Sequence, residues 1–151
     1  MNIDKIRILV LCTGNSCRSQ MAEGFFRQYG GNKLDVYSAG TSPVNINPKA
    51  IQVMREAGVD ISNHKSKHLS IYLNDTFDYV ITVCDNAARN CPIFRGAGKK
   101  LHWPFPDPAE AIGSDDEIMA NFRDARDQIS KKVTGWLGEL GLLPENRVKD
   151  E

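Results

Sequence analysis

The chain lacks long hydrophobic runs, an excess of charge of either sign and a start typical of a signal peptide. No apolar stretch of its 151 residues is long enough to cross a membrane, and MNIDKIRILVLC leads directly into a strand pattern. Lys and Arg together number 19, as do Asp and Glu, and neither sign collects into a block. We therefore expect a cytoplasmic protein that binds no membrane and no nucleic acid, and whose anionic ligands are small.

The sequence also lacks repeats, low-complexity segments and any linker between two halves. A chain of this length buries roughly two-thirds of its unfolded surface in one core, without help from disulfides or metals. We expect a single domain over residues 1–143, followed by a solvated tail over residues 144–151, and we expect the chain to be a monomer.

Cysteine is scarce, and the four thiols are Cys12, Cys17, Cys84 and Cys91. In a cytosolic chain with a full-sized core, thiols more often serve chemistry or metal binding than structural disulfides. A zinc site built from Cys84, Cys91 and His102 is possible by ligand type, but its spacing is unlike the close pairs usual in zinc sites. We expect no metal and no organic cofactor.

Strand patterns and helical patterns alternate along the chain. Strands are expected at residues 5–12, 34–40, 77–84 and 100–105, and helices at residues 19–30, 48–57 and 115–140. Residues 85–98 carry only a weak helical signal and are predicted to be mobile. The alternation predicts an α/β single domain with a central four-stranded parallel sheet, flanked by helices on both faces.

Two of the predicted strands end in a cysteine, Cys12 in the first and Cys84 in the third. In open parallel sheets, ligands bind beyond the carboxyl ends of the strands. The fold prediction therefore brings both thiols to the same edge of the sheet.

The stretch CTGNSCRS, residues 12–19, follows the first strand and leads into a helix. A loop of small residues can turn successive backbone N–H groups inward, and the helix N-terminus adds its positive end. The planar guanidinium group of Arg18 can donate two hydrogen bonds to a tetrahedral oxyanion. The positive electrostatic potential of Arg18 and the helix N-terminus should also depress the pKa of Cys12. Ser19 could stabilise that thiolate by a hydrogen bond. The predicted oxyanion cradle consists of Thr13, Gly14, Asn15, Ser16, Cys17, Arg18 and Ser19. The alternative, Cys12 as a small buried hydrophobe, suits this context less well.

CTGNSCRSQMAEG resembles the phosphate-binding loop of low-molecular-weight protein tyrosine phosphatases, and as a whole it is similar to thioredoxin-coupled arsenate reductases built on that fold. The similarity continues through VYSAG, NPKAI, DISNH, VC..N..CP and HW.F.DPA. The resemblance implies a phosphatase-like fold, arsenate as substrate with phosphate and sulfate as competing anions, and thioredoxin as partner.

The resemblance also implies roles for three thiols and an acid. Cys12 attacks arsenate, Cys84 attacks Cys12 to expel arsenite, and Cys91 attacks Cys84 and carries the disulfide to the surface. Asp107 matches the acid that assists the leaving oxygen, although Ala109 stands where the phosphatases commonly have an aromatic residue. Two alternatives stay open, a tyrosine phosphatase and a non-catalytic oxyanion or redox sensor, and Cys84 could instead be core filler.

Some of the reductases that this chain resembles bind potassium beside the loop through Asn, Glu, Ser and Asp side chains. Asn15, Glu23 and Ser38 match the first three, and Lys67 stands in place of the Asp. We expect the Lys67 ammonium to pair with Glu23 in place of a bound cation, unless Lys67 points into water. His64 is given at most a supporting role near Asn15 and Ser38.

Overall fold

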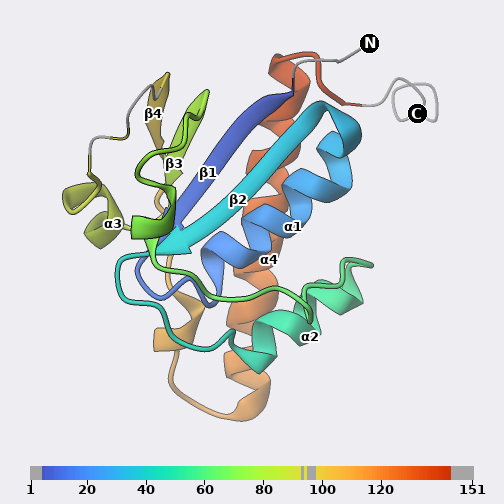
Figure 1. Cartoon of the computed structure of the whole chain (residues 1–151). Coiled ribbons are helices and arrows are strands. Elements are labelled where there is room, and N and C mark those ends of the chain that lie inside the picture. Colours follow the sequence, from blue (N-terminus) through green and yellow to red (C-terminus); the bar gives the residue numbers. More distant parts are fainter. Residues whose placement is uncertain (1–4, 93, 95–97, 144–151) are drawn as a thin grey trace.

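The computed structural model describes residues 5–92, 94 and 98–143, and the structural statements below concern those residues. Four strands form one parallel sheet in the order β2-β1-β3-β4 (Figure 1). They are β1 (Ile6–Cys12), β2 (Leu34–Gly40), β3 (Tyr79–Thr82) and β4 (Lys99–His102). The predicted four-stranded parallel sheet is confirmed.

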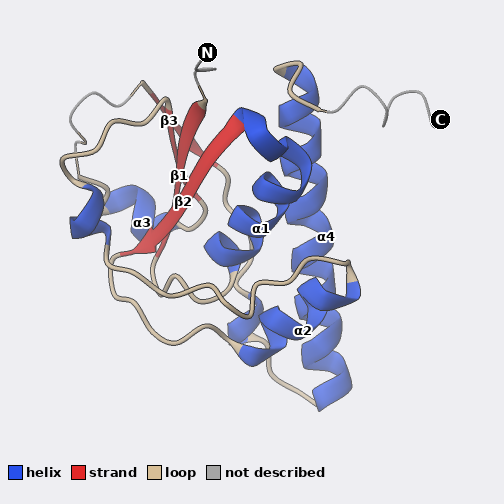
Figure 2. Ribbon diagram, turned by 45° about the vertical axis from the view of Figure 1, so that its right-hand side comes forward, coloured by secondary structure: helices blue, strands red, loops and turns tan. Residues whose placement is uncertain are grey.

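Helices cover both faces of this sheet. Figure 2 shows α1, α2 and α4 on one side of the strands and α3 on the other. The α-helices are α1 (Arg18–Gly30), α2 (Pro48–Glu56), α3 (Asp85–Arg89) and α4 (Asp115–Glu139), and short 3₁₀ turns occur at Gly31–Lys33, Leu69–Tyr72 and Pro108–Glu110. The expectation of an α/β domain with helices on both faces is confirmed.

Strand β1 lies inside the sheet, between β2 and β3. Its last five residues are buried, as its near-continuous apolar sequence predicts. The core continues between the sheet and the helices, where the Phe26 ring stacks on Trp103 and meets Trp136 edge to face, with centroids about 6 Å apart in each pair. The packed core thereby fixes where β1 ends and α1 begins.

Local capping signals in the sequence define where two helices begin. The Asn47 side chain accepts a hydrogen bond from the Lys49 N–H at 2.9 Å, with Pro48 at the first helical position of α2. Ser114 and Glu117 form the reciprocal capping box that starts α4. Both predicted helix starts are confirmed.

The structure departs from the sequence prediction after β3. Residues 85–89, predicted to lie in a mobile segment, form the short helix α3, whose first turn is capped by the Cys84 sulfur. The third strand spans Tyr79–Thr82 rather than residues 77–84, so Cys84 lies beyond its end. The last strand ends at His102 rather than at residue 105, and a 3₁₀ turn forms at Pro108–Glu110. Part of the segment 85–98 and the predicted tail at residues 144–151 lie outside the described residues.

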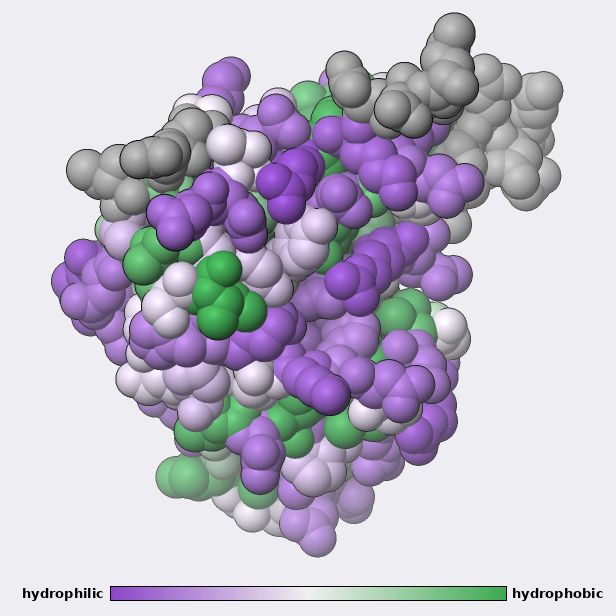
Figure 3. Space-filling view, viewed as in Figure 1, coloured by the Kyte–Doolittle hydropathy of each residue, from purple (hydrophilic) through white to green (hydrophobic). Residues whose placement is uncertain are grey.

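The surface is mainly polar on the face that Figure 3 shows, with apolar side chains in small groups. The large apolar side chains with the greatest exposure are Val44, Ile71 and Ile112. Isolated apolar residues of this kind are normal on a protein surface. Among the described helices, none combines the length and the apolar character that a membrane span requires.

Candidate functional site

The loop at residues 12–18 joins β1 to α1, and its carbonyl groups point away from its centre into neighbouring segments. Successive carbonyls of the loop accept hydrogen bonds from backbone N–H groups of residues 41–47. These pairs are Cys12 with Thr41 at 3.2 Å, Thr13 with Ser42 at 2.9 Å, Gly14 with Val44 at 2.9 Å and Ser16 with Asn47 at 3.0 Å. The segment after β2 therefore holds the loop by its acceptors and leaves its donors free.

The donors of the same loop are the groups that an oxyanion needs. Within the described part of the chain, the backbone N–H groups of residues 14–17 have no hydrogen-bond partner, and the Thr13 N–H favours the thiolate form of Cys12. Helix α1 begins at Arg18, so its positive end adds to this field. These free donors lie in the loop that the sequence predicts to be an anion cradle, and an oxyanion could bind to them.

Asn15 is the residue that fixes the shape of the cradle. It is fully buried and has φ = 49°, a left-handed conformation that Asn tolerates better than most residues. Its side-chain amide donates to Ser19 and Ser38 at 2.9 Å each, and its side-chain oxygen accepts from the Lys67 N–H at 2.8 Å. The Asn15 carbonyl accepts from Gln20 at 3.0 Å. A fully satisfied polar network thus holds the strained loop in one conformation.

Ser19 belongs to this network rather than to the nucleophile. Its hydroxyl accepts from Asn15, and no hydrogen bond joins Ser19 to Cys12 among the described residues. The predicted contact between Ser19 and the Cys12 thiolate is therefore absent from the structure, and Ser19 acts on the cradle through Asn15.

Gly40, at the end of β2, lies against the cradle. A Cβ atom at Gly40 would sit 2.4 Å from the Thr13 carbonyl oxygen and 3.0 Å from the Asn15 nitrogen. Atoms cannot approach so closely, so only glycine lets β2 pack beside this loop. The role of Gly40 depends on a close approach that sequence reasoning does not reveal.

Arg18 and Asp107 lie together at the mouth of the cradle. Arg18 donates to the Phe105 carbonyl at 3.0 Å, and its other terminal nitrogen lies 3.4 Å from an Asp107 oxygen. The Arg18 Nε–H is buried and has no hydrogen-bond partner in the described part of the molecule. An orphaned donor beside free backbone N–H groups is the arrangement expected where an oxyanion binds.

Cys12 and Cys84 are neighbours at the carboxyl edge of the sheet, as predicted. The Thr13 hydroxyl, which follows Cys12 in the chain, lies 3.2 Å from the Cys84 sulfur. The Ala87 N–H donates to the same sulfur at 3.4 Å. Cys84 is therefore held by specific contacts, and the alternative that it is simple core filler is not supported.

The pKa values of the two thiols shift in opposite directions. The hydrogen bond donated by Cys12 lowers the pKa of Cys84 to about 5 in spite of burial, with further help from Thr13 and Ala87. The same hydrogen bond, followed by burial, raises the pKa of Cys12, although the Arg18 charge opposes this. The lowered pKa that the sequence predicts for Cys12 therefore lies on Cys84, because the sequence gives no sign that a second thiol touches the first.

The remaining cysteines lie in different surroundings. Cys17 is buried at the N-terminus of α1, and burial raises its pKa to about 11. Cys91 is partly exposed beyond the far end of α3, and burial raises its pKa as well. All four thiols are free in the structure, and Cys84 lines the hollow at the mouth of the cradle whereas Cys91 does not.

The predicted ion pair between Lys67 and Glu23 is wrong. The buried Glu23 carboxylate pairs with Arg27 at 2.8 Å, because Arg27 lies one helical turn further along α1. The Lys67 ammonium donates instead to the Lys65 carbonyl at 2.8 Å, and burial lowers its pKa. His64 lies 3.8 Å from Glu23, so it does stand beside this network. The cation in contact with Glu23 is therefore Arg27.

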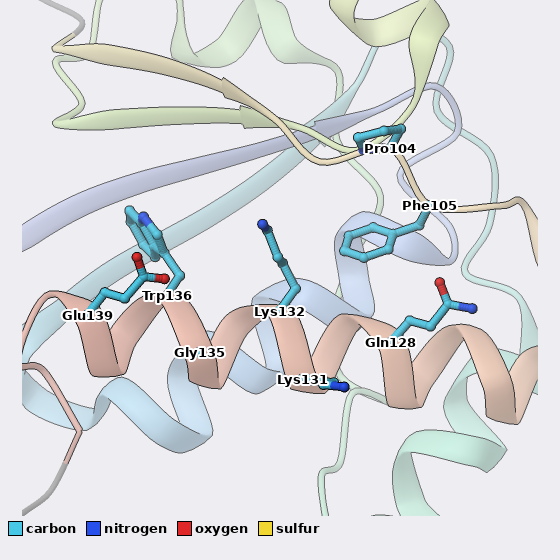
Figure 4. A pocket seen from close by; sticks show the side chains of 8 residues that line it. All are labelled: Pro104, Phe105, Gln128, Lys131, Lys132, Gly135, Trp136 and Glu139. Carbon is cyan, nitrogen blue, oxygen red and sulfur yellow. The ribbon is translucent and has the colours of Figure 1, made fainter.

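Two hollows in the surface can be compared as locations for the candidate site. The first has a volume of about 470 Å³ and is lined by Thr13, Arg18, Cys84, Asp85, Asn86, Asp107 and Glu110. The second, of about 410 Å³, runs along α4 between Trp136 and Gln128 of that helix and the facing residues Pro104 and Phe105 (Figure 4). Cys84 lines the first hollow, and no thiol lines the second among the described residues. No group of three or more metal-ligating side chains occurs among the described residues.

Comparison with known proteins agrees with this geometry. The chain is 46% identical over 131 residues to an arsenate reductase of Halalkalibacterium halodurans, which covers 87% of this chain and 94% of the relative. It is 45% identical over 126 residues to an arsenate reductase of Bacillus subtilis, covering 83% and 91%. The structure is similar to that of an arsenate reductase in the phosphate binding state, with a TM-score of 0.76, 31% identity, and 89% and 98% of the two chains covered.

The family assignment depends on almost the whole chain. The pattern of the family described as low molecular weight phosphotyrosine protein phosphatase matches residues 7–147, which includes the cradle, all four cysteines and Asp107. The chain therefore belongs to the low molecular weight phosphotyrosine protein phosphatase family.

Proposed function

We propose that this protein reduces arsenate to arsenite through a relay of Cys12, Cys84 and Cys91, and that thioredoxin reduces the final disulfide. The observation that carries the proposal is the position of Cys84 beside the oxyanion cradle, where its sulfur lies 3.2 Å from the hydroxyl of Thr13, the residue after Cys12. A phosphatase needs one nucleophilic cysteine, whereas reduction of an oxyanion needs two electrons, which a pair of thiols supplies as it becomes a disulfide.

In the first step, Cys12 attacks arsenic. Arsenate binds to the free N–H groups of residues 14–17 and to Arg18, which disperse its negative charge. A sulfur–arsenic bond forms and an arsenic–oxygen bond breaks, and the oxygen leaves as water. Its protons come from Cys12 and from Asp107, which lies beside Arg18 at the mouth.

In the second step, Cys84 attacks Cys12. A disulfide forms between the two sulfurs, and the electron pair of the sulfur–arsenic bond passes to arsenic, which leaves as arsenite. Cys84 already lies beside its target, and the contacts from the Thr13 hydroxyl and the Ala87 N–H, together with the Arg18 charge, favour its thiolate form.

In the third step, Cys91 attacks the Cys84 sulfur, and Cys12 leaves as a thiolate. The disulfide between Cys84 and Cys91 then passes to the dithiol of thioredoxin by two further exchanges. Cys91 is the only thiol of the relay that is partly exposed, which suits contact with a protein reductant.

The second candidate function is a tyrosine phosphatase, favoured by the cradle, Arg18 and Asp107, which suffice for attack on a phosphate ester. Ala109 follows the Asp107-Pro108 pair and provides no aromatic wall for a phenyl ring. We expect weak phosphatase activity at most, because the cradle binds tetrahedral oxyanions of both kinds but holds an aromatic leaving group poorly.

One assay separates these functions from a non-catalytic sensor. Purified protein, arsenate, thioredoxin, thioredoxin reductase and NADPH should give sustained NADPH oxidation that stops when any one component is omitted. A sensor would consume NADPH once at most, and a phosphatase would release phosphate from an aryl phosphate at a rate independent of thioredoxin. Absence of arsenate-dependent turnover would refute the reductase assignment.

A further inference from the structure

Helix α3 lies between the two cysteines that must meet in the last disulfide. Cys84 caps its first turn, and Cys91 follows its last residue by two positions. Seven residues of helical spacing span about 10 Å, whereas bonded cysteines have Cα atoms about 4.4–6.8 Å apart. Residues 84–91 must therefore shorten for the disulfide to form, and we expect at least the end of α3 to open before Cys91 reaches Cys84.

Little within α3 itself opposes that opening. The helix has five residues, of which only Ala87 is buried, and a helix of this length is not stable alone. Its side chains make one local hydrogen bond among the described residues, an exposed one from the Asn90 amide to the Asn86 amide oxygen. The energy that keeps α3 folded must therefore come largely from contacts to the rest of the molecule.

A chain of three side chains ties α3 to the sheet. Asp85 lies 3.1 Å from Nε2 of His102 on β4, and Nδ1 of His102 lies 2.8 Å from the hydroxyl of Thr82 on β3. Thr82 and His102 are paired in register on the adjacent strands β3 and β4. In the described residues, no other side chain of α3 makes a hydrogen bond to the sheet. We refer to Asp85, His102 and Thr82 as the clasp.

The clasp stands between the two thiols. Asp85 lines the 470 Å³ hollow with Cys84, and His102 and Thr82 line a separate hollow of about 180 Å³ with Cys91. The Asp85 and His102 side chains are 74% and 38% exposed, so their contact is weak enough to break without disrupting the core.

We propose that the clasp is a positioning device that keeps Cys91 away from Cys84, and that its release sets the rate of the last disulfide exchange. In that exchange Cys91, as a thiolate, forms a bond to Cys84 while the bond from Cys84 to its previous sulfur breaks, and that sulfur leaves as a thiolate. The proposal rests on the proposed function for its biological meaning, but the opening of α3 can be measured without arsenate.

The test uses Cys12→Ser protein, in which Cys84 has no partner in the cradle. An aromatic disulfide with a coloured thiolate, dithiobisnitrobenzoate, should release one thiolate as Cys84 attacks it. A second thiolate follows as Cys91 attacks the mixed disulfide. We expect Thr82→Val and Asp85→Asn each to speed the second release about two- to fivefold, the range expected for an exposed ion pair. The double variant should be no faster than the faster single variant, because both break one clasp.

Three comparisons make the result specific. Asp85→Asn removes a charge near Cys84 and could therefore also change the rate of the first thiolate release. Thr82→Val changes no charge, so in that case its effect on the second release is the one that tests the proposal. Asp85→Glu keeps the carboxylate and should lie near the parent rate, and Glu56→Gln removes an exposed ion pair with Arg123 that is distant in the fold. Hydrogen exchange at the Ala88 and Asn90 amides should quicken by a similar factor in the two clasp variants. An unchanged or slower second release in Thr82→Val would overturn the proposal, whereas loss of arsenate turnover alone would refute only the reductase function.

Discussion

The cradle loop at residues 12–18 and the segment at residues 84–91 begin alike and are built differently. Each follows a strand that ends at the same edge of the sheet, and each begins at a cysteine. The cradle is held by four backbone carbonyl contacts and a buried network around Asn15. The second segment has one buried residue in its helix and a single side-chain tie to β4.

This difference corresponds to two demands of the proposed chemistry. Stabilising a charged transition state requires donors that are already in place, because reorientation would cost free energy during the reaction. Passing a disulfide along three thiols requires one of them to travel. In the proposed chemistry, the rigid region holds the oxyanion, and the weakly held region carries the disulfide to the surface, where electrons from thioredoxin enter.

The largest effect should come from a change that breaks the rigid region. Gly40→Ala places a methyl group 2.4 Å from the Thr13 carbonyl, so the cradle must shift. We expect a loss of about 1–3 kcal/mol in the free energy of unfolding and about a 100-fold loss in the rate of arsenate reduction. The matched control is Gly135→Ala in α4, where an added Cβ meets nothing within 4 Å. It should stabilise the protein by up to about 1 kcal/mol and leave the rate unchanged.

The same mutation made in both regions should have unequal effects. Asn15→Ala removes the buried hydrogen-bond partner of Ser19, Ser38 and the Lys67 N–H. We therefore expect the free energy of unfolding, measured by urea denaturation, to fall by about 2–4 kcal/mol. Asn86→Ala removes only an exposed contact to Asn90 and should change stability by less than about 0.5 kcal/mol. Similar losses in the two variants would contradict the contrast between the regions.

The thiols of the two regions should differ in their dependence on pH. Cys84 has a pKa of about 5, so its thiolate dominates above that pH and its alkylation by iodoacetamide should vary little between pH 6 and 8. Cys91 has a raised pKa and should react slowly over this range. Cys12→Ala removes the hydrogen bond that lowers the pKa of Cys84, so alkylation of Cys84 at pH 6 should slow about tenfold or more. Peptide mapping by mass spectrometry measures each site separately.

The smallest effect should come from a helix cap outside both regions. Ser114→Ala removes the capping box of α4. We expect the free energy of unfolding to fall by about 1 kcal/mol, which should be measurable as a lower melting temperature. Arsenate turnover should not change, since neither the cradle nor α3 depends on this cap. A clear fall in turnover at a temperature where the variant is folded would show that global stability, rather than the two regions, limits activity.

The sequence predicted the parts of the molecule that depend on local patterns. Apolar strand runs, the Asn47 cap and the Ser114 capping box each specify structure within a few residues, and all three are confirmed. The approach of Cys12 and Cys84 was also predictable, because parallel strands end at one edge of a sheet.

Contacts between distant residues were less accessible to sequence reasoning. The pairing of Glu23 with Arg27 instead of Lys67, the approach of Gly40 to Thr13 and the transfer of the low pKa to Cys84 all depend on side-chain positions in the folded molecule. Helix α3 was missed because five residues are too few to form a stable helix alone, so it depends on the Cys84 cap and on the contact between Asp85 and His102.

A single-turnover experiment on Cys91→Ser protein tests the relay most directly. With arsenate and no reductant, we predict one arsenite per chain and a disulfide between Cys12 and Cys84 in the mass spectrum, with no further turnover when thioredoxin is added in catalytic amount. Continued turnover equal to that of the unaltered protein, or arsenite formed without a disulfide between Cys12 and Cys84, would contradict the three-cysteine relay.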